Sequence, residues 1–547
     1  MYIDTSTVRN GKKTYTRHLL RTSFRVDGKV CHKTLLNLSG CSEAEVAALK
    51  LALKHKDQLS NLTSLDQIDT SLGKRVGAVW TLKMIADRLG LSQAIGSQLD
   101  GKRALLQVFA RMIDQGSRLS AVRLAKSHAL CEILGIDKLN EDDLYENLAW
   151  LEKHQASIEK KLFARRFQNE MPTLFLYDVT SSYLEGTCNA LGRFGYNRDG
   201  KKGKLQIVVG LLTGPDGLPL AVRVFEGNTS DSKTVSEQVR ILAKTFGVKE
   251  VTLVGDRGML KGPQIEALPD DFRYITAITK PQIVHMLSTG LFQMELFTDR
   301  VCEVDVEENR YVLRRNPVRA AQMAETRESK YAAMVKFAEV QTKYLSEHSK
   351  ANAKKALERV TTKMKQLVAD GWLCVTEERR NIRVIQDPIK LAEVALLDGC
   401  YVIKSDVPKN GADAQTLHDR YCDLENVERA FRTMKTACLD LRPVYVHKEE
   451  STKGHVFVVM LALLLQRELE RCWNELDITV EEAIDELGSI HTVELRLGSA
   501  MICEIPKPNE RARKILEKAF ITLPRAIPNT EAHVHTKKKL PPERYHQ

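Results

Sequence analysis

Two aspartates of this chain stand where metal-dependent chemistry could be carried out. Asp178 follows the apolar run 174–177, and Asp256 follows the apolar run 251–255. Both runs are typical of buried strands, so we expect each aspartate at a strand end, where its carboxylate stays ionised. Carboxylates, water and phosphate oxygens are the ligands that Mg²⁺ prefers. Two such ions roughly 3.5–4 Å apart can activate an attacking oxygen and stabilise a leaving one.

A third carboxylate, Glu428, lies in the segment 421–435, whose pattern predicts a helix. Tyr421, Glu428 and Lys435 recur at intervals of seven residues, which predicts that they share one helix face. Arg432 follows Glu428 by one turn and could pair with it. An adjacent apolar face is expected to pack on a sheet and consists of Leu424, Val427 and Phe431. The alternative is an ordinary amphipathic surface helix, and strand-end aspartates are also common as caps and turn residues.

The elements that would position these carboxylates begin after Pro172. Apolar segments predict five strands, over 174–180, 204–213, 218–226, 251–256 and 274–278. A helix is expected over 232–246, between the third and fourth strands. Three antiparallel strands, a helix and then further strands is the order of a ribonuclease H-like core. The predicted fold class is therefore α/β, with a mixed sheet.

The N-terminal part predicts two modules in front of this core. Residues 1–65 contain a hairpin that turns at Asp27–Gly28, followed by a helix over 42–60 that begins at Ser42 with Glu45 three residues later. The hairpin carries a row of basic residues that includes Arg17, Arg21 and Arg25. Residues 66–170 show helical stripes without a strand signal, which predicts a helical module.

An insertion is expected to split the core. We assign the first part of the core to 171–297, the insertion to 298–397 and the second part, with the Glu428 helix, to 398–505. Short strands at 301–306 and 310–315 lead into the span 318–370, which lacks Gly and Pro and predicts a long helix or a helical pair. Strands at 372–376 and 401–403 would return the chain to the sheet. Residues 506–547 are polar and basic, and a flexible tail is expected there.

Taken together, these segments resemble the DDE transposases of bacterial insertion sequences, in the branch with the Y-(2)-R-(3)-E-(6)-K signature. Tyr421, Glu428 and Lys435 fall on its spacing. The resemblance extends over roughly 172–290 and 398–465 and includes the segments 177–181, 195–200, 227–231 and 255–259. The signature arginine falls on Leu424, which cannot bind phosphate, and Arg432 is the candidate substitute.

The resemblance implies both an activity and the residues that carry it. Asp178, Asp256 and Glu428 would be the catalytic residues and the ligands of two Mg²⁺ ions, for which Mn²⁺ could substitute. Tyr421 and Lys435 would contact the DNA strand near the cut. The implied reaction is cleavage of the ends of an insertion sequence and their joining to target DNA by two-metal phosphodiester transfer. A related nuclease without strand transfer and an inactive DNA-binding derivative are the alternatives.

The charge of the chain favours a polyanionic partner. The net charge is +11 and the sequence pI is about 9.0. The glycine-rich segment 192–200 lacks the Lys-Ser/Thr pair of a nucleotide-binding P-loop, so no nucleotide cofactor is expected. The basic residues in and after it are better suited to DNA phosphates, and these are Arg193, Arg198, Lys201 and Lys202. The partners that the resemblance implies are element ends and target DNA, with a homodimer on DNA because two ends must be brought together.

Several other residue patterns argue against competing classes of site. The eleven cysteines contain no CxxC pair, so no zinc ribbon is indicated. The longest apolar run, 456–465, is half a membrane span and predicts a buried helix. We expect no membrane association and a bacterial cytoplasmic location, at the nucleoid when DNA is bound. Asp199 and Asp231 are interpreted as turn or cap residues, and His447 and His455 as hydrogen-bonded histidines.

The basic hairpin generates a prediction about DNA ends. Deletion of residues 1–65 should abolish specific binding of the element ends, because the arginines of this module supply backbone contacts that position the protein on DNA. An electrophoretic mobility assay with end and scrambled DNA would measure this loss. Unchanged preference of the truncated protein for end DNA would show that the module serves another purpose, such as holding a dimer together.

Overall fold

The computed structural model describes residues 1–11, 13–56, 69–436, 439–497, 500–527 and 533–536. The chain divides into two compact units. The first comprises Met1–Gly73, His491–Pro506 and Pro524–Ile527, and the second includes Lys74–Ile490 and Lys507–Leu523. All three candidate carboxylates belong to the second unit.

The first unit contains two small sheets and a helix. One sheet joins β1 (Tyr2–Asn10), β2 (Lys13–Val26) and β3 (Lys29–Asn37) in antiparallel order. Asp27 and Gly28 both have positive φ in the β2–β3 turn, which confirms the predicted hairpin. Helix α1 (Glu43–Lys54) begins with the predicted capping box of Ser42 and Glu45. The predicted continuation of this helix over 57–60 lies outside the described residues.

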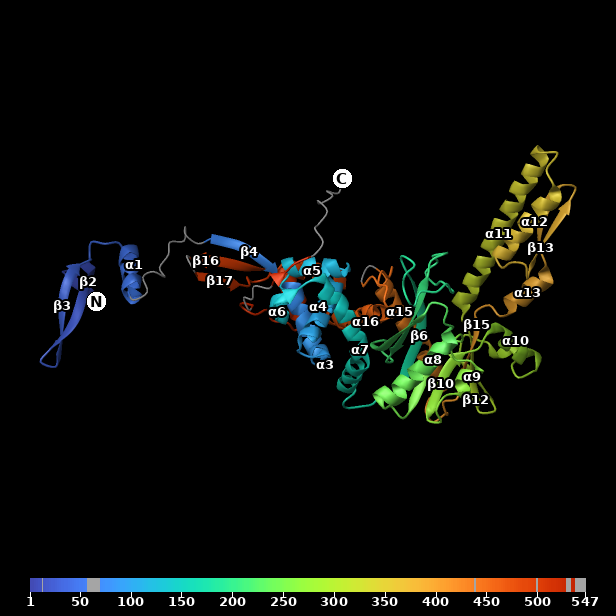
Figure 1. The fold of residues 1–547 in the computed structure, drawn as a ribbon, viewed down its shortest axis with the longest axis horizontal. Helices are drawn as coiled ribbons and strands as arrows, with labels where there is room; N and C mark the ends of the chain where they lie inside the picture. Colours follow the sequence, from blue (N-terminus) through green and yellow to red (C-terminus); the bar gives the residue numbers. More distant parts are fainter. Residues whose placement is uncertain (12, 57–68, 437–438, 498–499, 528–532, 537–547) are drawn as a thin grey trace. The chain divides into compact units, whose positions relative to one another are not determined.

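The second sheet of this unit joins distant parts of the chain. Its order is β17 (Ala500–Glu504), β16 (His491–Leu497) and β4 (Asp69–Arg75), so the blue β4 lies beside the red β16 and β17 in Figure 1. The expectation of helices alone over 66–170 was wrong at this strand.

The second unit begins with a helical module. Its helices are α2 (Gly77–Leu89), α3 (Leu91–Ile95), α4 (Leu99–Ile113), α5 (Arg118–Ser127), α6 (Leu130–Leu134) and α7 (Glu141–Arg166). A short parallel pair, β5 (Lys138–Leu139) and β18 (His533–Val534), accompanies them. Helix α16 (Glu449–Trp473) packs against α2, α4 and α7. The predicted apolar run 456–465 is buried within α16, as expected.

The core of the second unit is an eight-stranded mixed sheet. Its strands, in spatial order, are β11 (Cys302–Val306), β12 (Asn309–Arg315), β15 (Cys400–Ser405), β10 (Phe272–Ala277), β9 (Val251–Gly255), β6 (Leu174–Tyr183), β7 (Gln206–Thr213) and β8 (Pro219–Glu226). Strands β6, β7 and β8 are antiparallel, whereas β9 and β10 run parallel to β6. This order confirms the predicted ribonuclease H-like fold.

Helices cover both faces of the sheet around β6. Phe175, Tyr177 and Val179 point into an apolar core that includes residues of α8 (Asp231–Arg240) and of the π-helix η3 (Ile241–Phe246). The predicted helix over 232–246 is therefore present, but it changes to π-helical geometry at Ile241. Helix α15 (Leu424–Lys435) contacts β6 and β7, and the orange α15 lies near the teal β6 in Figure 1.

The insertion is a helical pair with its own small sheet. Helices α11 (Pro317–Glu347) and α12 (Ala353–Gln366) confirm the predicted pair. They share an apolar core with β13 (Leu373–Glu378) and β14 (Asn381–Gln386), built around Met334, Trp372 and Ile382. Helix α13 (Pro388–Leu396) follows.

Two expectations about this segment need correction. The strand at 372–376 does not return the chain to the main sheet, because β13 pairs with β14 alone. Strands β11 and β12, which we placed in the insertion, pair with each other, and β12 pairs with β15. The excursion from the sheet therefore runs from Pro317 to Leu396.

The remaining helices connect these parts. They are α9 (Gly262–Glu266), α10 (Lys280–Ser288), the 3₁₀ turn η4 (Met294–Leu296), α14 (Ala414–Cys422), α17 (Val480–Gly488) and α18 (Glu510–Lys518). The expectation of a flexible tail from 506 was wrong at α18, because Ile515 and Leu516 are buried and the Trp473 indole donates a hydrogen bond to the Ile515 carbonyl. The predicted flexibility of 537–547 lies outside the described residues. None of the described helices has the length and apolar character needed to cross a membrane.

The close approach of α16 to α7 depends on Gly454. A Cβ atom at this position would lie 2.1 Å from the Leu148 carbonyl oxygen, so Gly454→Ala must push the helices apart. We expect a loss of about 1–3 kcal/mol in the free energy of unfolding, measured as a lower thermal unfolding temperature. Gly488→Ala is the matched control, since no atom lies within 4 Å of its added Cβ. Equal melting of the two variants would contradict the packing described.

Candidate active site

The register of two parallel strands brings Asp178 beside Asp256. Tyr177 of β6 pairs with Gly255 of β9, and the parallel ladder between these strands ends there. The next residue on each strand is one of the two aspartates. We expected Asp178 at the end of β6, but this was wrong, because residues 178–183 continue to pair with β7. It lies instead where the pairing with β9 stops, while its backbone still pairs with Leu211 of β7.

The third carboxylate arrives on a helix that is shorter than predicted. Helix α14 ends at Cys422, Asp423 forms the junction, and α15 begins at Leu424. Tyr421 and Glu428 therefore lie on different helices, and the assumption of one continuous face was wrong. The buried residues of α15, Val427, Ala430, Phe431 and Met434, hold it against the sheet and leave Glu428 on the exposed side.

All three carboxylates line one cavity of about 590 Å³. Asp178 comes from β6, Asp256 from the end of β9 and Glu428 from α15. Tyr421, Leu424 and Arg432 line the same cavity. The hydroxyl of Tyr421 donates a hydrogen bond of 3.5 Å to Oδ1 of Asp256. The fold thus brings together residues that lie up to 250 positions apart in the sequence, and we predicted this approach.

The electrostatics of the cavity show that the carboxylates interact. Burial, together with the charges of Asp256 and Glu428, raises the pKa of Asp178 to about 7, whereas the backbone hydrogen bond from Val179 and the charge of Arg198 oppose the shift. Burial and the charge of Asp256 also raise the pKa of Tyr421, so its hydroxyl keeps its proton and can donate. Asp178 is therefore partly protonated near pH 7, whereas we expected its carboxylate to stay ionised.

The donor set suits a hard divalent cation. Carboxylate oxygens from three elements face a cavity with room for waters and phosphate oxygens, which is the environment that Mg²⁺ prefers. A cation there would favour the ionised form of Asp178, against the burial and the like charges that raise its pKa. Within the part of the chain that the structure describes, no three His, Cys, Asp or Glu side chains are gathered as closely as the ligands of one ion. The side chains would have to close around the cation.

Lys435, at the end of α15, does not line the cavity. Its Nζ lies 2.9 Å from Oδ1 of Asp199, which also accepts a hydrogen bond from Arg442. Asp199 is completely buried and accepts a further bond from the backbone N–H of Tyr183. This network ties α15 to the loop after β6, so Asp199 is more than a turn residue.

The other predicted basic residues have diverse surroundings. Arg198 donates to both carboxylate oxygens of Asp231, the first residue of α8. Arg193 pairs with Glu226 at 2.9 Å. Lys201 lies over the ring of Tyr183, 5.8 Å from its centroid. Lys202 is exposed.

The hairpin arginines belong to the first unit. Arg17 and Arg25 are exposed on β2, whereas Arg21 pairs with Asp4 at 2.8 Å. The charges of Arg17 and Arg25 are therefore accessible to a ligand of this unit, whereas the charge of Arg21 is partly neutralised by Asp4.

Sequence reasoning missed two basic residues of the cavity. Arg257 follows Asp256 directly, and Lys280 begins α10 shortly after β10. Both lie just after the carboxyl ends of neighbouring parallel strands, and that shared position was the signal that could have revealed them. They add positive charge to the rim of an otherwise acidic cavity.

Comparison with known protein families identifies the chain. The family described as "Transposase DDE domain" matches residues 170–465, more than half of the sequence. The chain belongs to the DDE transposases. A second match, to "IS1634 family transposase, N-terminal domain", covers residues 3–69. The protein is therefore an insertion-sequence transposase, an enzyme of DNA strand cleavage and transfer, and its family implies DNA binding and the use of a divalent metal.

Other comparisons add less. The solved structures include the piggyBac transposase synaptic complex with hairpin DNA, similar to this chain at 9% identity over 75% of each chain, with a TM-score of 0.35. No curated protein matches the sequence significantly.

The raised pKa of Asp178 predicts how a cation-free transposase responds to pH. Because the folded pKa exceeds the unfolded one, the stability that Asp178 contributes is present at low pH and is lost as the pH rises toward about 7. Asp178→Asn removes this penalty, so the variant should melt above the wild type at pH 8 in EDTA, and the difference should shrink at pH 5.

Differential scanning calorimetry at the two pH values measures this effect. Asp270→Asn, at an exposed position before β10, is the control and should follow the wild type at both pH values. A constant difference between Asp178→Asn and the wild type from pH 5 to pH 8 would contradict the raised pKa of Asp178.

Proposed function

We propose that this transposase cleaves the ends of an insertion sequence and joins them to target DNA, with Asp178, Asp256 and Glu428 as its catalytic residues. The observation that carries the proposal is that these carboxylates come from β6, β9 and α15 yet line one cavity, where Asp256 and Glu428 both act on the pKa of Asp178. The other acid of the cavity, Glu425, is not among the main causes of the pKa shift of Asp178 and serves as a comparison.

The three carboxylates would hold two Mg²⁺ ions, which Mn²⁺ could replace. When bound, such ions supply the activation of an attacking oxygen and the stabilisation of a leaving oxygen. The reaction is in-line attack at phosphorus: a water oxygen forms a P–O bond and the 3′ oxygen leaves with a proton as a hydroxyl. In the second step the oxygen of that 3′-hydroxyl forms a bond to a target phosphorus, and the target's own 3′ oxygen leaves with the proton as a new 3′-hydroxyl. The chain then needs no covalent protein–DNA bond.

The chain's own residues orient these groups and the DNA. The protonated Tyr421 hydroxyl holds the Asp256 carboxylate in place through its hydrogen bond. Arg257, Lys280 and Arg432 line the cavity and would offset phosphate charge as the strand enters. Arg432 is the cation of α15 closest in role to the missing signature arginine, because it lines the cavity together with Leu424 and Glu428.

The signature role of Lys435 requires an exchange of partners. Lys435 would contact DNA near the cut by leaving Asp199 for a phosphate. Arg442 bonds to the same Asp199 oxygen and would keep that buried carboxylate neutralised during the exchange. The arrangement therefore allows Lys435 to move without leaving a buried charge unpaired.

DNA end recognition is assigned to the first unit, where Arg17 and Arg25 are exposed. The basic residues Arg193, Arg198, Lys201 and Lys202 would contact DNA next to the catalytic cavity, with Arg198 and Arg193 exchanging Asp231 and Glu226 for phosphates. A homodimer on DNA would hold two ends together for joining.

The proposal predicts that binding and chemistry separate at the carboxylates. Asp178→Ala, Asp256→Ala and Glu428→Ala each remove a metal ligand but leave the basic surface intact. Each variant should bind element ends as well as the wild type, since fewer acids face the phosphates, while cleavage with Mg²⁺ falls by orders of magnitude. Binding is measured by mobility shift, and cleavage with labelled element ends.

Glu425→Ala is the matched control on the same helix and in the same cavity. It should keep cleavage within a few-fold of the wild type. If Glu425→Ala lost cleavage and Glu428→Ala kept it, Glu425 and not Glu428 would be the catalytic acid. Nicked ends without joined product in the wild type would mean a nuclease, and DNA binding without any cleavage would mean an inactive derivative.

A further inference from the structure

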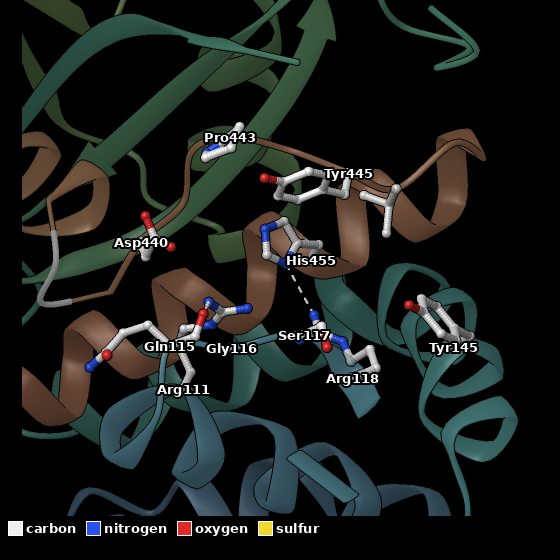
Figure 2. Close-up of a pocket in the computed structure, with 11 residues that line it drawn as sticks. Arg111, Gln115, Gly116, Ser117, Arg118, Tyr145, Asp440, Pro443, Tyr445 and His455 are labelled. Carbon is white, nitrogen blue, oxygen red and sulfur yellow. Dashed lines mark hydrogen bonds between the residues drawn. The ribbon is translucent and has the colours of Figure 1, made fainter. Parts of the chain in front are cut away.

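A second cavity lies in the same unit, away from the three carboxylates. It has a volume of about 230 Å³ and lies between α4, α5 and α7 of the helical module and the segment 440–446 that connects α15 to α16. Figure 2 shows Arg111 and Arg118 on its lower side, with Tyr445 and His455 above them and Tyr145 at one flank. The volume far exceeds the 10–15 Å³ that one water molecule needs.

Both arginines are buried side chains whose charge is not paired. Arg111 and Arg118 are only 5% and 6% exposed. Arg111 Nη1 donates to the Gln115 carbonyl at 2.5 Å, and Arg118 Nη2 lies 3.0 Å from His455 Nδ1. The Nε atoms of both arginines have no hydrogen-bond partner. Among the described residues, neither guanidinium forms an ion pair with a carboxylate.

The groups that face these arginines do not neutralise them. Burial and the two guanidinium charges hold the pKa of His455 well below its ordinary value, so His455 is neutral and accepts the hydrogen bond of Arg118. Burial lowers the pKa of Arg111, and the charges of Asp440, which lines the cavity, and of Asp114 oppose that shift. Burial and the charge of Arg111 lower the pKa of Arg118 to about 9, which still leaves it protonated at neutral pH. The cavity therefore holds two guanidinium groups against one carboxylate, that of Asp440, and its lining is positive overall.

Buried charges of this kind are ordinarily paired with an anion. Guanidinium groups match phosphate oxygens in geometry and charge, and two of them with free donors form a site for one tetrahedral anion. The aromatic rings of Tyr145 and Tyr445, 44% and 68% exposed, flank the opening and provide apolar contact for the sugar or base beside a phosphate.

We propose that this cavity binds one phosphate group of a DNA strand through Arg111 and Arg118. The inference rests on the proposed function, because it assigns a DNA contact to a site outside the catalytic cavity. The loop that lines the cavity also carries Arg442, which bonds to Asp199 beside Lys435. A phosphate held here would fix the loop between α15 and α16, and so help to position the strand that reaches Glu428.

Two other anions share this chemistry. Free inorganic phosphate would fit the same guanidinium donors, and the experiment below separates it from DNA. A carboxylate from a second protein chain is less favoured, because the net charge of +11 selects for a polyanion. If replacing the arginines left DNA binding unchanged, the cavity would bind one of these two anions instead of DNA.

The test measures DNA affinity against salt in the Asp178→Ala background, so that cleavage plays no part. Loss of one phosphate contact lowers the slope of log affinity against log salt by about 0.9. Arg118→Gln should show this reduction, whereas Arg240→Gln, at an exposed position paired with Glu237, should keep the wild-type slope. Equal slopes for the two variants would overturn the inference while the proposed function stands. Failure of the parent protein to bind DNA at all would overturn both.

A second variant guards against misfolding of Arg118→Gln. Tyr145 is exposed enough to accept a charge, and Tyr145→Glu places a carboxylate where it can occupy the arginines in place of phosphate. It should lower the salt slope as Arg118→Gln does, while the neutral Tyr145→Gln should not. Equal slopes for Tyr145→Glu and Tyr145→Gln would count against the site.

Thermal melting with inorganic phosphate at constant ionic strength separates the two sources of the anion. Phosphate should raise the unfolding temperature of the wild type more than that of Tyr145→Glu. That result together with the reduced salt slope supports the proposal. A phosphate-dependent shift with an unchanged slope would assign the cavity to free phosphate and overturn the DNA assignment, and the absence of both effects would overturn the site itself.

Discussion

The parallel register between β6 and β9 is the constraint on which the candidate active site depends. Because Tyr177 pairs with Gly255, Asp178 and Asp256 become neighbours at the point where the ladder ends. A shift of one residue in either strand would turn that carboxylate to the opposite face, into the apolar core that now holds Tyr177. Burial of Phe175, Tyr177 and Val179 beneath α8 and η3 therefore fixes the register and, with it, the relative position of the two aspartates.

Helix α15 brings the remaining acid to this pair and links it to the rest of the second unit. Its apolar side packs on β6 and β7, and Glu428 on its exposed side lines the cavity. Its C-terminal end is tied to the buried Asp199 through Lys435, and Arg442 of the following loop joins the same carboxylate. That loop also borders the cavity of Arg111 and Arg118. Glu428, the Lys435 network and the arginine cavity are thus joined by one short stretch of chain.

The sequence predicted most of the core because its signals are local. Apolar runs mark β6 to β10, and an aspartate beside an apolar run is visible without a structure. The helix break at Asp423 was not predictable from spacing alone, since Tyr421 and Glu428 remain seven residues apart whether or not the helix is continuous. The partner of Lys435 and the pairing of β13 with β14 are tertiary features. The buried pair Arg111 and Arg118 was missed because arginines on amphipathic helices are ordinarily solvated.

The central claim is that Asp178, Asp256 and Glu428 together hold the ions used in DNA cleavage. Anomalous diffraction from Mn²⁺ in crystals of the transposase bound to an element end would test it most directly. The account predicts two anomalous peaks about 3.5–4 Å apart, each within bonding distance of oxygens from these three carboxylates and of the phosphate to be cut. Strong peaks held by other residues, with Glu428 turned away from the metals, would contradict it.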